Sequence, residues 1–366
     1  MRTHIKFGVQ LLFLLFGMVS SNAGARGHLR QIWKLRLGDI IQNADSKPTA
    51  ASIFGLSFSP DGQRILVVYG PTWKEESVII LRTADPKTNV RRLGINPPSY
   101  EYEASSNRSI VWATPEHIIV NRSLLNLSNG SSCTLPPGGY DLLSVPNQII
   151  GNDLKYYDLN CQCVGQIDHS DSWHIIDVSA ERSVFFVRQE VIRDKRLVQA
   201  DNFAIDAKGQ TIPFKVPIVP VSRFAQSGKT ICAVQGRRWN WNVACWDIDT
   251  GKEVAVSRKY NNLDIQPALY APRIVLSNYG RTFDFINLRW AVGSLRKRII
   301  WDIQTGQEIV SWQPKIEETI IGTSEFRQVV RKPYRFAISP DGEYIIEGGA
   351  GELILRKIEP GQLGRH

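Results

Sequence analysis

Short apolar runs separated by turn sequences extend over most of this chain. In Gln31–Leu37 the apolar side chains of Trp33, Leu35 and Leu37 alternate with polar residues. An alternation with a period of two predicts a half-buried β-strand, and no long helical pattern competes with these runs. The sequence therefore predicts an all-β fold.

Two of the predicted strand–turn–strand units have almost the same sequence motif. Ser59–Gly62 and Ser339–Gly342 both read Ser-Pro-Asp-Gly, and each lies between two apolar runs. Proline presets φ at the second position of a tight turn, and glycine accepts the positive φ that a Cβ would penalise. A second sequence motif, Trp-Asp-Ile followed by Thr-Gly, begins at Trp246 and again at Trp301.

Five weaker copies of the strand–turn–strand unit lie between the two clear ones. The seven turns fall near residues 62, 116, 147, 181, 228, 272 and 342. Their average spacing of about 47 residues is typical of a propeller blade with four short strands. We predict a single seven-bladed β-propeller with four-stranded antiparallel blades over residues 26–366. A six-bladed ring, an eight-bladed ring and a β-sandwich are the alternatives.

The C-terminal blade lacks one strand. Tyr334–Ser339, Glu343–Glu347 and Glu352–Lys357 supply three strands before the chain ends. We predict that the N-terminal strand Gln31–Leu37 pairs as the outer strand of this last blade. Joining the two ends of the chain in one sheet closes the ring and removes exposed strand edges.

The Ser-Pro-Asp-Gly turns and the two Trp-Asp dipeptides resemble the WD40-like β-propeller superfamily, in particular its exported bacterial members. The resemblance covers nearly all of the predicted propeller, although the Gly-His pair of many WD40 blades is absent. It implies a fold and rarely an activity.

The first 25 residues have the segment order of a secretory signal peptide. Arg2 and Lys6 flank the start, Phe7–Val19 is an apolar run, and Ala23–Ala25 supplies small residues for cleavage. We expect cleavage after Ala25 and an exported protein, periplasmic or extracellular, without a stable membrane span. The apolar run is shorter than the roughly 20 residues of a permanent transmembrane helix. An uncleaved membrane anchor is the alternative.

Two of the five cysteines lie opposite each other in a predicted hairpin. Cys232 and Cys245 are equally distant from its turn, so a disulfide is expected; a bridge closing such a loop contributes about 3 kcal/mol. A pair of reduced core thiols is the alternative. Cys133, Cys161 and Cys163 leave an odd number, and their pairing stays open.

Several hairpins between the second (b) and third (c) strands of the predicted blades combine arginine with aromatic residues. All b–c hairpins of a propeller open on one face, so we predict one basic, aromatic binding face there. Alternatively, the aromatic rings pack each loop onto its blade under arginine stems. The candidate binding residues are Trp73, Arg193, Arg237, Arg238, Trp239, Trp241, Tyr279, Arg281, Arg289 and Trp290.

The net charge narrows the class of partner. It is +9, and removal of Arg2 and Lys6 leaves +7, which favours anionic partners or serves solubility. Export argues against nucleic acid. No nucleophile elbow, phosphate loop or metal-ligand spacing occurs in the sequence, so we expect no cofactor and no metal. The leading interpretation is a non-enzymatic scaffold for a protein or an anionic envelope polymer. A glycan lyase or hydrolase with its site at the central channel is the alternative.

Overall fold

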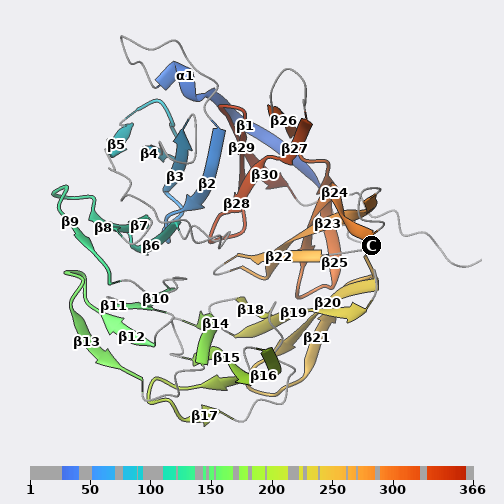
Figure 1. The fold of residues 1–366 in the computed structure, drawn as a ribbon. Helices are drawn as coiled ribbons and strands as arrows, with labels where there is room; N and C mark the ends of the chain where they lie inside the picture. The colour runs from blue at the N-terminus through green and yellow to red at the C-terminus, as the bar shows by residue number, and fades with distance from the viewer. Residues whose placement is uncertain are drawn as a thin grey trace, which may run out of the picture.

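Seven four-stranded antiparallel sheets form a ring in the computed structural model of this protein (Figure 1). The predicted seven-bladed β-propeller is therefore confirmed. The structure describes residues 27–40, 52–70, 77–88, 90–93, 110–120, 123–136, 143–145, 148–151, 154–167, 173–179, 184–193, 196–212, 222–225, 229–237, 240–260, 263–268, 271–284, 289–321 and 328–359.

Each blade is an up-and-down sheet that runs from an inner strand (a) to an outer strand (d). The first four blades, in the order a to d, are β2 Ser52–Phe58, β3 Arg64–Gly70, β4 Ser77–Arg82 and β5 Arg91–Leu93; β6 Ile110–Thr114, β7 His117–Val120, β8 Ser123–Asn126 and β9 Ser132–Thr134; β10 Leu143–Val145, β11 Gln148–Ile150, β12 Lys155–Tyr157 and β13 Cys163–Gln166; and β14 Trp173–Ser179, β15 Val184–Arg193, β16 Arg196–Ile205 and β17 Thr211–Ile212.

The remaining three blades have the same strand order, and the outer strand of the last blade is the N-terminal strand β1. They are β18 Ser222–Ala225, β19 Thr230–Arg237, β20 Asn240–Asp247 and β21 Glu253–Val256; β22 Leu263–Pro267, β23 Arg273–Asp284, β24 Arg289–Asp302 and β25 Gln307–Trp312; and β28 Arg335–Ile338, β29 Tyr344–Gly349, β30 Glu352–Glu359 and β1 His28–Arg36. The inner strands of successive blades contact one another around the ring, and β28 contacts β2 again.

The core consists of the interfaces between neighbouring blades. In blade 1, Leu66 and Val68 of β3 pack with Trp112 of blade 2. Ile65 and Val67, whose side chains lie on the other face of β3, pack with residues of blade 7. Alternate side chains of one strand thus enter two different cores, which explains why the central strands are apolar at nearly every position.

The predicted closure of the ring is confirmed. Strand β1 pairs antiparallel with β30 from His28↔Glu359 to Arg36↔Glu352, and Leu35 lies in the core between blades 7 and 1. Strand β1 starts three residues before the predicted Gln31. The indole Nε1 of Trp33 donates to the Thr83 carbonyl of blade 1 at 2.8 Å, which ties the closing strand to the next blade.

Both Ser-Pro-Asp-Gly turns have the same hydrogen bonds. The Ser59 hydroxyl donates to Asp61 and accepts from the Arg64 amide at 2.9 Å. The amide of Gly62, at φ +70°, donates to the Ser59 carbonyl. The turn that begins at Ser339 repeats each of these contacts. The serine and aspartate side chains by which the motif is recognised in the sequence are therefore the ones whose hydrogen bonds stabilise the turn.

The structure has strand pairing that the sequence pattern does not indicate. The pattern indicates Gly236–Asn242 and Asn278–Arg298 as the loops of two b–c hairpins, but much of both ranges continues as paired strands. A two-stranded hairpin, β26 Ile316–Ile321 with β27 Gln328–Pro333, stands between blades 6 and 7 and was not predicted. A single helical turn, α1 Leu37–Ile40, follows β1.

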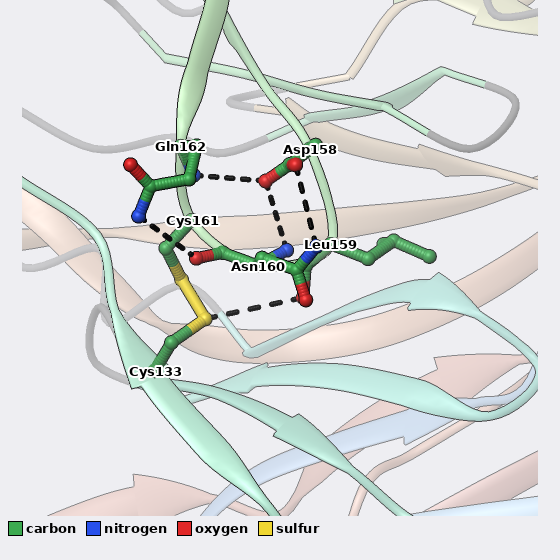
Figure 2. The surroundings of a disulfide bond; sticks show 6 residues. All are labelled: Cys133, Asp158, Leu159, Asn160, Cys161 and Gln162. Atoms are coloured by element: carbon green, nitrogen blue, oxygen red, sulfur yellow. Dashed lines mark hydrogen bonds between the residues drawn. A yellow bond between two sulfur atoms is a disulfide. The ribbon is translucent and has the colours of Figure 1, made fainter.

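The structure contains two disulfides. Cys232 and Cys245 are cross-strand partners of β19 and β20 in blade 5 and form the expected bridge, with their Cα atoms 4.1 Å apart. Cys133 of β9 bonds to Cys161 in the β12–β13 turn, so this second bridge joins blade 2 to blade 3 (Figure 2). Cys163 is a free, exposed thiol.

Cys161 occupies a backbone conformation that usually needs glycine. Its φ is +62°, and its amide donates to the Asp158 carbonyl. The corresponding turn of blade 4 has the same hydrogen bonds, with Gly209 at φ +79° in place of the cysteine. A side chain with a Cβ is disfavoured there by roughly 1–2 kcal/mol. The disulfide with Cys133 accounts for a cysteine at this position.

Removal of the closing strand is expected to destabilise the whole ring. Deletion of residues 26–38 should cost about 5 kcal/mol or more, because Leu35 and Leu37 lose their burial and β30 loses its partner. Leu35→Ala alone should cost about 2–5 kcal/mol. Ile32→Ala, in the same strand but 38% exposed, is the control and should cost less than about 1 kcal/mol. Urea unfolding measures all three; a normal midpoint for the deletion would refute the closure.

A second prediction concerns the backbone of the β12–β13 turn. Without the bridge, the Cys133→Ala/Cys161→Gly protein should be about 1 kcal/mol more stable than Cys133→Ala/Cys161→Ala, because glycine accepts the positive φ. Gly209→Ala in blade 4 should show the opposite sign and a similar size. Equal stability of the two double variants, measured by thermal unfolding, would contradict the assignment of strain to Cys161.

Candidate functional site

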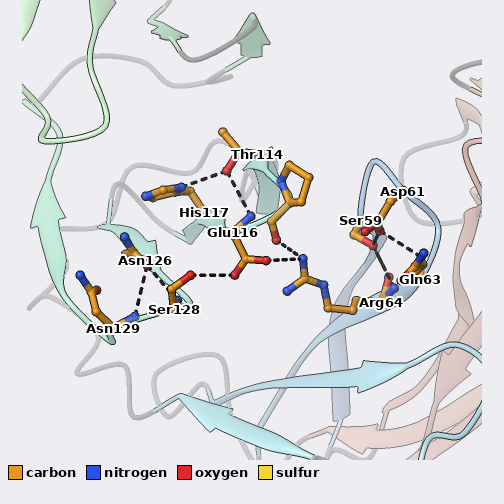
Figure 3. A network of polar contacts seen from close by, with 11 residues as sticks. Ser59, Asp61, Gln63, Arg64, Thr114, Glu116, His117, Asn126, Ser128 and Asn129 are labelled. Carbon is orange, nitrogen blue, oxygen red and sulfur yellow. Dashed lines mark hydrogen bonds and ion pairs between the residues drawn. The ribbon is translucent and has the colours of Figure 1, made fainter.

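The two faces of the ring are built differently. The a–b and c–d turns open on one face, the turn face, and the b–c hairpins and d–a connections open on the other, the b–c face. On the turn face, Arg64 donates to the Pro115 carbonyl of blade 2 and pairs with Glu116 at 3.1 Å (Figure 3). Arg273 likewise donates to the Gly342 carbonyl of blade 7 at 2.6 Å. Each arginine is the first residue of a b strand and joins its blade to the next.

Three carboxylates of the turn face have local hydrogen-bond partners. The Ser128 hydroxyl donates to Glu116 at 3.0 Å, and this bond and the Arg64 guanidinium lower the pKa of Glu116 against the opposing effect of its burial. The Asp247 and Asp302 carboxylates each accept the amide and hydroxyl of the threonine three residues later. These carboxylates therefore serve turn geometry.

Two-stranded ribbons occur on the b–c face of the described part of the chain. In blade 4, pairing between β14 and β15 stops at Gln189, whereas β15 and β16 remain paired to Arg193 and Arg196. In blade 5, β19 and β20 likewise remain paired to Arg237 and Asn240, beyond the end of β18. In blade 6, β22 pairs only as far as Asn278, which also pairs with Lys297. Beyond this pair, Tyr279–Asp284 and Arg289–Arg296 have no other pairing partner than each other among the described residues. We call Tyr279–Asp284 and Arg289–Lys297 the blade-6 ribbon. The β26–β27 hairpin, which enters between blades 6 and 7, is a further ribbon.

Seven of the ten candidate binding residues belong to strands of these b–c hairpins, on blades 4, 5 and 6. They are Arg193, Arg237, Trp241, Tyr279, Arg281, Arg289 and Trp290. Trp73, Arg238 and Trp239 lie outside the described residues. The strands therefore bring the backbones of the seven to one face, and their role in binding stays a prediction.

Trp241 has a structural environment. Its side chain is partly buried against the core between blades 5 and 6. Its amide and carbonyl pair with those of Tyr260, at 2.8 and 2.6 Å. The Arg258 guanidinium lies over the Tyr260 ring and pairs with Glu308 of blade 6 at 2.7 Å. The described contacts of Trp241 are therefore those of an aromatic residue that packs onto its blade.

A buried charge network lies at the base of the blade-6 ribbon, and sequence reasoning missed it. The Arg298 side chain of β24 is 3% exposed and pairs with Glu347 of β29, 1% exposed, at 2.9 Å. Glu347 also accepts from Arg356 Nε at 3.2 Å and from Trp312 Nε1 at 2.9 Å. Arg298 donates in addition to the Tyr334 carbonyl, just after β27. The network fixes blade 6, blade 7 and the β26–β27 hairpin together.

The base of the β26–β27 hairpin has further anchors. Glu317 accepts from the Ser52 hydroxyl at 3.0 Å and from the Ala350 amide at 3.2 Å. Glu352 pairs with Lys315 at 2.7 Å and with Lys34 at 2.6 Å. Burial alone would raise the pKa of Glu352, but the two ammonium groups outweigh it and lower that pKa. The hairpin is therefore held at its base by blades 7 and 1.

Neither a metal cluster nor a membrane-spanning helix occurs within the described ranges. They contain no group of three or more His, Cys, Asp or Glu side chains that could hold a metal ion. In the same ranges, no helix is long and apolar enough to cross a membrane.

No family model and no curated protein matches this chain. Among solved structures it is similar in fold to several chains, two of which are named as propellers. Hsv2 of Kluyveromyces marxianus is 8% identical, with a TM-score of 0.44 and coverage of 82% of this chain and 89% of Hsv2. The Cps50 (Swd1) propeller of Myceliophteria thermophila is 12% identical (TM-score 0.47; 90% and 99% coverage). The Dos1 propeller is 9% identical (TM-score 0.48; 90% and 95%). The seven-bladed fold is shown by the sheet topology of the chain itself.

The buried network generates a stability prediction with a matched surface control. Glu347→Gln should cost about 3–5 kcal/mol, because it leaves the Arg298 guanidinium buried without its counter-charge. Arg258→Met breaks a pair whose arginine is 61% exposed and should cost at most about 1 kcal/mol. Denaturant unfolding measures both. Similar small losses for the two variants would show that the network is not a buried charge system.

Proposed function

We propose that this chain is an exported, non-enzymatic β-propeller scaffold of the WD40-like type that binds a protein or an anionic envelope polymer through its b–c face. The observation that carries the proposal is the extension of the b and c strands beyond the blades on that face. In the described part of the chain, these extensions pair outside the four-stranded sheets. Residues held on such elements by a rigid scaffold are available for recognition.

The composition of the extensions supports an anionic partner. The described parts of the blade-6 ribbon contain Arg281, Arg289, Arg296 and Lys297 but only one acidic residue, Asp284. In blade 4, Arg193 and Arg196 lie at the end of the extension. Positive charge concentrated on one face steers acidic proteins and polyanions toward it.

Two features support export. The N-terminal segment has the pattern of a signal peptide, with proposed cleavage after Ala25. The two disulfides fit an oxidising compartment, since such bonds are rare in the cytosol of most cells. No observation among the described residues favours the glycan lyase or hydrolase alternative.

The proposal is tested by removing the extension without touching the ring. Asn278 and Lys297 are cross-strand partners, so residues 279–296 can be replaced by a two-residue Asn-Gly turn. A second variant replaces Arg237, Arg238 and Trp239 with serine and keeps the structural Trp241. We expect capture of proteins or polyanions from an envelope extract to fall at least tenfold for either variant.

The matched control carries the same kind of change on the turn face. Lys208, Lys252 and Gln304 are exposed residues of c–d turns and can be replaced with serine. This variant should retain normal capture, and all variants should keep the unfolding temperature of the parent. Equal capture by the parent and by the b–c variants would reject the b–c face.

A further inference from the structure

The blade-6 ribbon leaves the backbone edge of β23 unpaired on the channel side. The sheet order β22-β23-β24-β25 places β22 inside β23, and β22 pairs with β23 only from Pro267↔Ile274 to Leu263↔Asn278. Over Tyr279–Asp284, β23 pairs with β24 alone among the described residues. The outward N–H and C=O groups of this segment are therefore a template for one more antiparallel strand.

The other strand of the ribbon, β24, has a neighbour. Strand β27 approaches β24 without pairing with it, and Arg298 of β24 is bonded to the Tyr334 carbonyl just beyond β27. Over Tyr279–Asp284 the β23 edge has no second pairing partner in the described part of the chain, and it continues the line of β22.

The ribbon stands on a rigid base. Arg298, the residue of β24 that follows the ribbon, is fixed by its ion pair with Glu347. Its guanidinium carbon also lies 4.1 Å from the centroid of the Phe336 ring, in a cation–π contact. Two register shifts between Asn278 and Arg281 bend the ribbon where it leaves the blade. A two-stranded ribbon is only marginally stable by itself, so a third strand would stabilise it, and the fixed base lowers the ordering cost of binding.

We propose that the partner of this face is a protein, and that an extended acidic segment of it adds as a strand to the β23 edge over Tyr279–Asp284. This inference rests on the proposed function and chooses between its two partner classes. An edge offers alternating donors and acceptors, which a polypeptide matches along its length. A polyanion without N–H donors can match only the charge. The arginines at 281, 289 and 296 against the single Asp284 select acidic sequence.

The experiment uses the unaltered mature protein and a defined probe. The probe is a fluorescent seven-residue peptide of alternating glutamate and valine. Its control has the same sequence with N-methyl groups on two adjacent central residues, which block both backbone edges and leave the charges in place. Fluorescence anisotropy gives the two Kd values, and amide hydrogen exchange locates the protected segment.

We expect the probe to bind at least tenfold more tightly than the methylated control and to protect amides of Tyr279–Asp284. Replacement of residues 279–296 by Asn-Gly should abolish this difference. The analogous replacement of residues 190–200 in blade 4, between the partners Gln189 and Asp201, should not.

Three results would overturn strand addition: equal binding of the two peptides, protection outside the ribbon, or no binding of the probe. Inorganic polyphosphate separates this failure from that of the proposed function. Polyphosphate binding that requires the b–c face would retain the proposed function with a polymer partner. Absence of any binding that depends on this face would reject both proposals.

Discussion

Burial of both faces of every blade is the constraint on which the structure depends. Leu66 and Ile65 are neighbours in β3, yet they enter different cores, one shared with blade 2 and one with blade 7. No blade can complete its core alone, so the ring must close before any part of it is fully stable. The pairing of β1 with β30 supplies that closure through chain ends more than 300 residues apart in sequence. Non-local pairing of this kind makes folding slow, and a closed ring in return leaves only short, protected strand edges.

The same constraint separates the two faces. Contacts such as Arg64 with Pro115 and Arg273 with Gly342 link successive blades on the turn face, where short turns bring neighbours together. On the b–c face, the strands of blades 4 and 6 continue as two-stranded ribbons beyond the four-stranded sheets. Blades 2 and 3 have strands of three to five residues, whereas β23 and β24 have 12 and 14. Residues in excess of what the core needs are the basis for assigning recognition to that face.

The sequence predicted the features that follow from the blade repeat or from one hairpin, and missed an inserted hairpin and a bridge between blades. Ser59–Gly62 and Ser339–Gly342 were recognisable because the same side chains make the same turn bonds, and the phase of the alternation identified the closing strand. The β26–β27 hairpin has no counterpart in other blades, so no period revealed it. The Cys133–Cys161 bridge joins two blades, and its pairing depends on how neighbouring outer strands lie, which a single sequence does not specify. Candidate residues such as Arg281 could be assigned to a hairpin, but a contact with an unknown partner is not encoded in a local pattern.

The Arg298–Glu347 pair lies at the seam between blades 6 and 7, at the base of the blade-6 ribbon. Two charges buried to this extent gain little over a well-packed apolar pair, because the loss of hydration offsets their attraction. Their value is geometric: Glu347 accepts from Arg298, Arg356 and Trp312 at fixed angles, and Arg298 reaches Tyr334 at the base of the inserted hairpin. Apolar side chains could fill the same volume but would tolerate sliding between blades 6 and 7. A directional network at this seam fits a role in orienting the two hairpins that rise from it. The seam between blades 6 and 7 thus combines an apolar core with a directional polar network, which suits it to holding a rigid edge for a partner.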